Sequence, residues 1–520
     1  MPEIFGEPLD TVVPDDLTLP QFILDSHHPR RPVRTNTPWL IEDETGRNIG
    51  LDEIRARTFG FANGLTLRYG IILIFSPNHV DYPPAIWATH RLGGIVSGAN
   101  PAYTTEELLY QIQVVKATLI IAHPSSFHTA LDAARAAGIP SDRVITFGES
   151  TQPTVESIIQ LGLSNEPAFV ERRLKKGEGK TKVAFLNFSS GTTGRPKAVV
   201  IAHYAPIVNV IQIAQYTKVT ENYAPWEEQR FRPGDIAAGD IYGLVFSMSM
   251  VVIPKFSFTD FLKSIERHRI THLTSHPAVK DYDLSGIRFL ISGAAPLSAE
   301  LIGQGYGLTE SSTSITMYSV DQKIGVPGSA GQLLPGVVAR VVKHDGSLAG
   351  FNEPGELRVK APSLALGYWN DEKATNETFV DGWLCTGDEV IIREDKEVFI
   401  VDRLKEIMKV KGFQVAPAEL EGCILDHPDV ADACVVPVPL AFVVLHAFTA
   451  KRVVKDPREA DKVKASIMKH VADNKVAYKR LAGGVEFIDV IPKNPSGKLL
   501  RRVLRDQARQ LRAEELKAKL

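Results

Sequence analysis

The chain has 520 residues, of which 44% are hydrophobic and 23% are charged. This is the composition of an ordinary globular protein, and the length exceeds what one hydrophobic core serves, so we expect roughly two to four domains. With 59 basic and 61 acidic residues, the net charge of −2 gives no reason to expect a nucleic acid or an anionic membrane as a partner.

The three cysteines, Cys385, Cys423 and Cys434, do not have the spacing of metal ligands. We expect Cys423 and Cys434 to pack as small apolar residues in a reducing compartment. No apolar run reaches the ~18 residues that cross a bilayer, so no transmembrane segment is expected. Acidic residues near the N-terminus argue against a signal or transit peptide.

In chain order, short Val- and Ile-rich runs alternate with longer helical stretches up to about residue 400. Such runs predict buried parallel strands, because a strand covered on both faces needs apolar residues at successive positions. Three of them lie at 71–75, 118–122 and 288–292.

Between residues 325 and 401, alternating strands separated by Pro and Gly turns predict a β-rich subdomain. Its expected strands lie at 337–342, 355–359 and 397–401. The segment 403–520 that follows has the length of a compact α+β domain. Its last helix is expected from about 499 to 518, with an apolar face of Leu500, Val503, Leu504, Ala508, Leu511 and Leu516.

The most informative motif is Asn-Phe-Ser-Ser-Gly-Thr-Thr-Gly-Arg-Pro-Lys at 187–197, which lies between two apolar runs. Its glycines permit close approach of the backbone, so N–H groups and hydroxyls can surround a polyanion while Lys197 supplies positive charge. The motif is not a Walker A loop, since Arg195 follows Gly194. A flexible Ser/Gly linker fits poorly between two strands. The motif therefore predicts binding of the phosphates of ATP.

This loop resembles the phosphate loop of the adenylate-forming superfamily, which includes acyl-CoA synthetases, 4-coumarate–CoA ligases, luciferases and peptide-synthetase adenylation domains. The similarity extends from about Pro38 to the end of the chain. Four more motifs follow in the family's order: Gly-Tyr-Gly-Leu-Thr-Glu at 305–310, Thr-Gly-Asp at 386–388, Asp-Arg-Leu-Lys at 402–405 running into 409–414, and Pro-Ser-Gly-Lys at 495–498.

The resemblance implies an α/β fold in two domains. A large N-terminal AMP-binding domain, 1–402, would contain parallel-rich sheets with helices and the β-rich subdomain at about 325–401. A small, mobile α+β domain, 403–520, would form a lid.

The resemblance also implies that residues of all five motifs bind ATP or AMP. These are Ser189, Ser190, Gly191, Thr192, Thr193, Gly194, Lys197, Gly305, Tyr306, Gly307, Thr309, Asp388, Arg403, Lys405, Lys409, Gln414 and Lys498, together with Gln304 just before the second motif. The expected catalytic residues among them are Lys498, Lys197 and Thr193. Lys411 and Gly412 are expected to contact CoA in a second conformation.

Each expected role has a chemical reason and an alternative. Glu310 offers the carboxylate that Mg²⁺ needs beside phosphates, and Tyr306 a flat ring for adenine, although the hexapeptide could be an ordinary turn. Asp388 would accept hydrogen bonds from the ribose, or be a turn aspartate. Lys498 would stabilise charge at the α-phosphate, or be a solvated lysine. Lys411 would contact CoA, or be a charged residue that protects a strand edge against pairing with another chain.

The acid substrate is expected to lie against Tyr242, Ala294, Ala295, Gln304 and Gly305. Four segments are shorter than the resemblance leads us to expect; the clearest is 296–303, which is too short for the crossover of about a dozen residues between parallel strands. Either the homologue is shortened, or loop residues are missing from the sequence. The intact motifs favour the second explanation. Missing residues would leave breaks near Asp240–Ile241, Ser275–His276, Leu301–Ile302 and Val438–Pro439.

The predicted function is an acid–CoA ligase that adenylates an aryl-propenoic or medium- or long-chain acid with ATP and transfers the acyl group to CoA, with Mg²⁺ as cofactor. There are two alternatives. One is a luciferase-like adenylating oxygenase, and the other is a non-catalytic homologue, if the short segments are real. The tripeptide Ala518-Lys519-Leu520 predicts recognition by the peroxisomal import receptor, and otherwise a cytoplasmic location. Histidines such as His203 are expected to lie at the surface or to have hydrogen-bond partners in the core.

Overall fold

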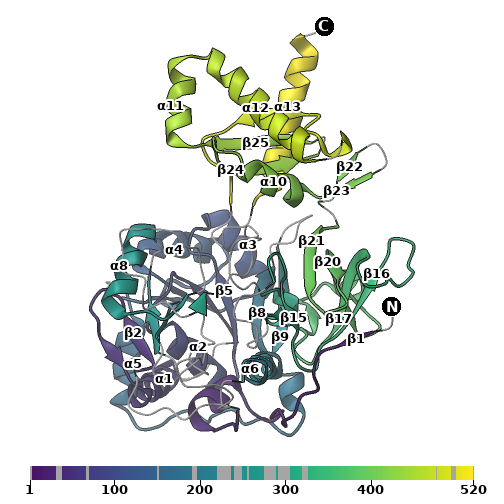
Figure 1. The fold of residues 1–520 in the computed structure, drawn as a ribbon. Helices are drawn as coiled ribbons and strands as arrows, with labels where there is room; N and C mark the ends of the chain where they lie inside the picture. The colour runs from purple at the N-terminus through teal and green to yellow at the C-terminus, as the bar shows by residue number, and fades with distance from the viewer. Residues whose placement is uncertain are drawn as a thin grey trace.

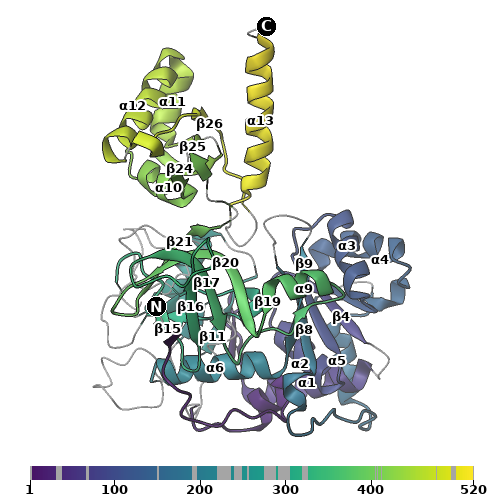
Figure 2. The same ribbon diagram turned by 90° about the vertical axis from the view of Figure 1, so that its right-hand side faces the viewer.

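The computed structural model describes residues 3–30, 38–65, 70–148, 152–189, 196–218, 236–238, 249–254, 257–273, 289–290, 305–318, 326–404, 406, 408–410, 413–437, 439–475, 477–493 and 499–518. A large body of sheets and helices forms the N-terminal part, and a smaller unit above it ends in a long helix (Figures 1 and 2). No helix in this described part of the chain is long and apolar enough to cross a membrane.

A seven-stranded sheet forms the centre of the body, in the order β18-β9-β8-β5-β4-β6-β7. Strands β8, β5, β4, β6 and β7 are mutually parallel, whereas β9 and β18 are antiparallel additions at one edge. The strands are β4 (Ile71–Phe75), β5 (Ile95–Ala99), β6 (Leu119–Ala122), β7 (Val144–Thr146), β8 (Val183–Ser189), β9 (Lys197–Ala202) and β18 (Gly367–Tyr368). The predictions of parallel strands at 71–75 and 118–122 are confirmed.

Helices cover both faces of this sheet, because alternate residues of its central strands point to opposite sides. Leu73 and Phe75 pack in one apolar cluster with the helices α3 (Thr105–Val115) and α4 (Phe127–Ala136). Ile72 and Ile74 pack in another. That second cluster involves α1 (Leu51–Leu65), α2 (Tyr82–Arg91) and α5 (Val155–Leu163).

A second sheet has the order β13-β12-β10-β11-β2-β3, with all pairs parallel except β2–β3. Its strands are β2 (Leu40–Glu42), β3 (Asn48–Ile49), β10 (Ile236–Ala238), β11 (Ser249–Val252), β12 (His272–Leu273) and β13 (Phe289–Leu290). The helices α6 (Tyr204–Tyr216) and α8 (Phe258–His268) belong to the same body. Strand β13 lies in the predicted run 288–292, whose other residues are outside the described chain.

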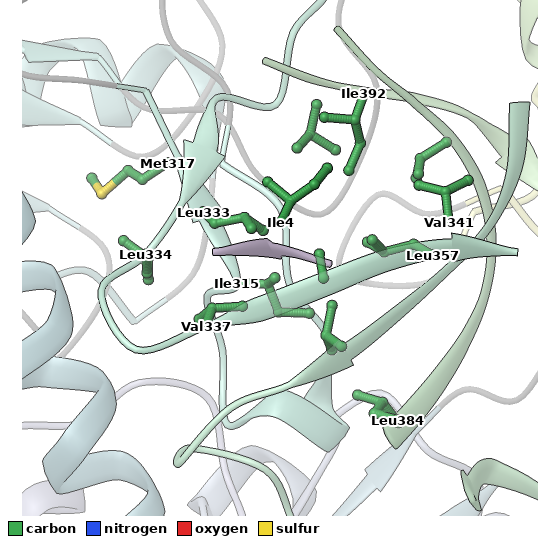
Figure 3. Close-up of a cluster of buried hydrophobic side chains, with 14 of the residues drawn as sticks. Ile4, Ile315, Met317, Leu333, Leu334, Val337, Val341, Leu357, Leu384 and Ile392 are labelled. Carbon is green, nitrogen blue, oxygen red and sulfur yellow. The ribbon is translucent and has the colours of Figure 1, made fainter. Parts of the chain in front are cut away.

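The predicted β-rich subdomain is an antiparallel sheet around its own core (Figure 3). Its strands are β16 (Val338–Val342), β17 (Pro354–Lys360), β19 (Phe379–Val380), β20 (Trp383–Ile392) and β21 (Val398–Arg403). The sequence did not indicate that β1 (Ile4–Phe5) joins this sheet, where Ile4 pairs with Ala339. A separate pair, β14 (Thr316–Met317) with β15 (Gln332–Leu333), and the helix α9 (Glu372–Thr378) complete this region.

The C-terminal unit has a small mixed sheet, in which β24 pairs antiparallel with β25 and β25 parallel with β26. Its elements are β22 (Met408–Val410), β23 (Phe413–Val415), α10 (Pro417–Leu425), β24 (Val430–Val436), β25 (Leu440–Leu445), α11 (Ala447–Lys455), α12 (Arg458–Asn474), β26 (Gly484–Phe487) and α13 (Arg501–Ala518). Val436 pairs with Leu440, so the last residue of β24 lies opposite the first of β25. The breaks predicted for the chain each include a residue outside the described ranges and stay predictions.

The last helix, α13, buries a narrower face than the sequence predicted. Leu504 and Ala508 are buried beside Phe442 of β25, but Val503 is 51% exposed and Leu500 is 39% exposed. A one-sided contact with the small sheet covers only the residues nearest to it, so the prediction of a broad apolar face was wrong for these two residues.

Two histidines form a buried pair inside the body. His90 Nε2 donates to the carbonyl of Ala184 (3.0 Å), and His203 Nδ1 accepts from the backbone of Leu19 (3.2 Å). The rings stand edge to face with centroids 4.7 Å apart, and the remaining nitrogen of each ring is buried without a partner. Burial lowers the pKa of His90 to about 4 and that of His203 to about 2. His203 is therefore buried, but only one of its two ring nitrogens has a hydrogen-bond partner. This corrects the expectation that it would be fully hydrogen-bonded in the core.

This pair should make the body sensitive to acid. A histidine whose pKa is depressed by folding contributes stability above its unfolded pKa of about 6.5, and that stability is lost as the pH falls toward the folded pKa. Between pH 7.5 and pH 5 the loss should be about 2 kcal/mol per histidine. We expect the free energy of unfolding, measured by denaturant titration, to fall accordingly.

The control is His203→Asn, whose amide oxygen can replace Nδ1 as the acceptor for Leu19 and does not titrate. It should lessen the pH dependence by about half. An unchanged dependence would show that the pair is not its source.

Candidate active site

The pairing of β8 with β9 holds the two ends of the phosphate-loop motif together. Ser189, the last residue of β8, lies opposite Lys197, the first of β9. The hydroxyl of Tyr110, on α3, donates to the carbonyl of Pro196 (3.1 Å) and so anchors the end of the motif. The motif residues Ser190, Gly191, Thr192, Thr193 and Gly194 lie outside the described residues.

Lys197 extends from the start of β9 toward the residues that follow β18. Its ammonium nitrogen lies 3.9 Å from Asp371 Oδ2 and 5.1 Å from the ring centroid of Tyr368. Asp371 also caps α9, because its other oxygen accepts from the backbone of Ala374 (2.9 Å). With 42% of its side chain exposed, Lys197 can reach an anionic ligand.

The turn that precedes Glu310 depends on a glycine. The backbone of Tyr306 pairs with Thr316, and a Cβ at Gly307 would lie 1.5 Å from the carbonyl oxygen of Thr313. Only glycine allows this contact, so the chain folds back tightly before the short 3₁₀ turn Thr309–Ser311.

Glu310 is buried, with 8% of its surface exposed, and it contacts Tyr368 of β18, the edge strand of the seven-stranded sheet. The hydroxyl of Tyr368 donates to Glu310 Oε1 (2.8 Å). Burial and the charge of Glu310 raise the pKa of Tyr368, so this hydroxyl stays protonated and remains a donor. Glu310, Tyr368 and Lys197 therefore meet at one place.

Asp388 lies on β20, directly opposite Arg403 of β21. The hydroxyl of Tyr306 donates to Asp388 Oδ2 (2.6 Å), and Arg403 Nε lies 3.6 Å from Asp388 Oδ1. Burial and the neighbouring carboxylate raise the pKa of Tyr306. Gly387, with a φ of +71°, lies just before Asp388 where the register of β20 against β17 shifts, a backbone conformation that favours glycine. The structure thus joins three predicted nucleotide-binding residues.

Comparisons with known proteins identify the family of this chain. Residues 27–369 match the model of the AMP-binding enzyme family, and residues 419–498 match the model of its C-terminal domain. The chain belongs to the AMP-binding enzyme family.

Relatives of this AMP-binding enzyme align over almost their whole length. It is 31% identical to "4-coumarate--CoA ligase 5" of Oryza sativa subsp. japonica, over 95% of each chain. It is 34% identical to "Probable 4-coumarate--CoA ligase 1" of Dictyostelium discoideum, over 85% of this chain and 87% of that one. The rice alignment spans 540 residues, more than this chain has, so the relative carries residues without a counterpart here.

Solved structures have the same fold. ATP-bound MatB from Rhodopseudomonas palustris superposes with a TM-score of 0.75 at 26% identity, over 91% of this chain and 97% of that chain. The anthranilate CoA ligase AuaEII, in complex with anthranoyl-AMP, gives a TM-score of 0.81 over 96% of this chain and 99% of that chain. Its 23% identity supports the fold alone.

The C-terminal domain of this AMP-binding enzyme is attached just after Arg403. The side chain of Asp402 accepts from the backbone of Ala418 at the start of α10 (3.1 Å). Arg501, at the start of α13, pairs with Glu406 and with Glu421, which are both nearly buried. Burial raises the pKa of Asp402 and of Glu421. These contacts join the linker, α10 and α13 into one unit.

Other predicted residues are only partly placed. Lys409 pairs with Gln414 through the backbone in the β22–β23 hairpin. A bridge between Lys493 and Leu499 brings together the two ends of the segment that contains Lys498. The side chains of Lys409 and Gln414 lie outside the described structure, as do the residues Lys405, Lys411, Gly412, Lys498, Tyr242, Ala294, Ala295 and Gln304.

The AMP-binding enzyme has a cavity of about 390 Å³ beside the junction, lined in part by Arg358, Glu389 and Leu404. Glu389 follows Asp388 on β20, and successive residues of a strand point to opposite faces. The cavity therefore lies across the sheet from the Asp388–Arg403 pair, and we do not assign it to the nucleotide.

Sequence reasoning missed Tyr368 and Asp371. The usable signal was the Gly-Tyr-Trp sequence at 367–369, in which an aromatic residue with a polar tip follows a glycine. Nothing in the sequence relates this segment to Glu310, which is 58 residues away.

Gly307→Ala should damage the site through its turn. The new Cβ would meet the backbone of Thr313, and overpacking of this kind costs about 1–3 kcal/mol. Gly305→Ala is the matched control, because its Cβ would lie 3.5 Å from the carbonyl of Thr316, an ordinary contact. Thermal unfolding should show a lower Tm for Gly307→Ala only; equal Tm values would contradict the crowded turn.

Proposed function

We propose that this AMP-binding enzyme is an acid–CoA ligase for aryl-propenoic or medium- to long-chain acids. It is an ATP-dependent CoA ligase in which an acyl-adenylate is the intermediate. The observation that carries the proposal is the convergence of Lys197, Glu310 and Tyr368 at one edge of the sheet, within a chain 31% identical to a 4-coumarate–CoA ligase over 95% of its length.

Two successive displacements make up the reaction. In the first, a carboxylate oxygen of the acid attacks the α-phosphorus of ATP, the bond to the bridging oxygen breaks, and pyrophosphate leaves. In the second, the sulfur of the CoA thiolate attacks the acyl carbonyl carbon, and AMP leaves with the electron pair of the broken C–O bond. Lys197 would face the phosphates, and charge stabilisation of this kind is the main catalytic device in phosphoryl transfer.

Asp388 and Arg403 support a ribose site. Asp388 has one oxygen bonded to Tyr306 and the other 3.6 Å from Arg403, and a carboxylate has further lone pairs for two ribose hydroxyls. Because Tyr306 is tied to Asp388 by its hydroxyl, its ring can form a fixed wall for adenine.

Glu310 fits a magnesium ligand. Its Oε1 is held by Tyr368, and a hard carboxylate oxygen is what Mg²⁺ binds when phosphates supply the other ligands. When bound, Mg²⁺ neutralises charge on the phosphates and on the leaving pyrophosphate.

The proposed class of acid substrate rests on two observations. Two relatives are named 4-coumarate–CoA ligases, and the sequence implied an acyl pocket around Tyr242, Ala294 and Ala295. Peroxisomal import through Ala518-Lys519-Leu520 stays a prediction; α13 extends to Ala518, and the last two residues lie outside the described chain.

The test of the activity is acid-dependent release of pyrophosphate together with consumption of CoA. A hydroxycinnamate and a medium-chain fatty acid should each be tried alone and then in competition. We expect turnover with at least one of them, and a higher kcat/KM for the hydroxycinnamate. No turnover with any acid would favour a non-catalytic homologue, and light emission with a luciferin would favour the oxygenase.

The two half-reactions should separate by mutation. Lys498→Ala should abolish pyrophosphate exchange but leave thioester formation from supplied acyl-AMP largely intact, because its charge serves only the first displacement. Lys411→Ala should have the opposite effect. Equal loss of both half-reactions in each variant would contradict alternation of the C-terminal domain between two conformations.

A further inference from the structure

Tyr368 contacts two predicted phosphate-site residues with different parts of its side chain. Its hydroxyl donates to Glu310 Oε1 (2.8 Å), while its ring lies under the ammonium group of Lys197, 5.1 Å from the centroid. Glu310 comes from the turn after Tyr306, and Lys197 from the end of the phosphate-loop motif. The side chain of Tyr368 therefore links the turn that contains Glu310 to the first residue of β9, Lys197.

The position of Tyr368 is itself fixed from several sides. As part of β18 it pairs with Val199 of β9, two residues after Lys197. Its backbone donates to Thr375 Oγ1 of α9 (2.9 Å). The ring of Phe379 stands against its edge, with centroids 6.3 Å apart. A side chain restrained in this way can determine where its partners lie.

We propose that Tyr368 is a positioning residue that orients Glu310 for a divalent cation bound with ATP. Its hydroxyl fixes one carboxylate oxygen and leaves the other for the metal, so the carboxylate loses little freedom when the cation arrives. Its ring supports Lys197 until phosphates replace it, since attraction between an ammonium group and a ring is weaker than that between an ammonium group and a phosphate. This inference rests on the proposed function.

The decisive variant is Tyr368→Phe, which removes one oxygen atom and keeps the ring under Lys197. Binding of Mn²⁺ is measured by its electron paramagnetic resonance signal in the presence of a non-hydrolysable ATP analogue. We expect the affinity for Mn²⁺ to fall about tenfold, as for loss of a hydrogen bond to a charged group. The affinity for the analogue without metal should change less than about twofold, because the ring remains.

A double-mutant cycle distinguishes positioning from general damage. In a Glu310→Gln background, Tyr368→Phe should weaken Mn²⁺ binding no further, because the carboxylate it orients is already gone. The matched control is Tyr204→Phe, since the ring of Tyr204 lies under Lys180 at a similar distance, 5.2 Å, away from the predicted phosphate site. It should leave Mn²⁺ affinity unchanged.

Three results would overturn the inference: unchanged Mn²⁺ affinity in Tyr368→Phe, equal weakening with and without metal, or a further loss in the Glu310→Gln background. The unmodified protein tests the proposed function separately. If it bound neither the analogue nor Mn²⁺, the ligase assignment would fail together with the inference; normal binding by the unmodified protein confines any failure to Tyr368.

Discussion

The antiparallel pairing of β8 with β9 is the constraint on which the candidate site depends. It places Lys197 opposite Ser189, and β9 in turn pairs with β18 at the edge of a sheet whose remaining strands are parallel. Through β18 it brings Tyr368 beside Lys197, and through Tyr368 it restrains Glu310. A slip of one residue in this register would turn the Lys197 side chain to the other face of the sheet, because side chains alternate along a strand.

The alternation of side chains also organises the junction with the C-terminal domain. On β20 and β21, Asp388 and Arg403 lie on one face of the sheet, whereas their neighbours Glu389 and Asp402 lie on the other. Asp402 accepts a hydrogen bond from the first turn of α10, which belongs to the C-terminal domain. One strand pair therefore carries both the proposed ribose-binding residues and the contact to the C-terminal domain, so the two lie next to each other on β20 and β21.

Local signals in the sequence identified the structure where burial and motif spacing act over short distances. The run 71–75 became β4 because both sheet faces are covered, and the alternating pattern after residue 325 became the antiparallel sheet of Figure 3. Long-range contacts gave no such signal. The contact between Tyr368 and Glu310 depends on which strand β18 joins, and the burial of α13 on how much of it the small sheet reaches.

The pairing of β1 with β16 has a consequence for biosynthesis. Ile4 lies opposite Ala339, so the first strand of the β-rich subdomain has no partner until the ribosome has added more than 330 further residues. At about 5–20 residues per second this takes on the order of 15–70 s. Throughout that time the apolar Ile4 has no sheet to cover it, and the N-terminal strand is incorporated into the fold after most of the body that follows it in the sequence.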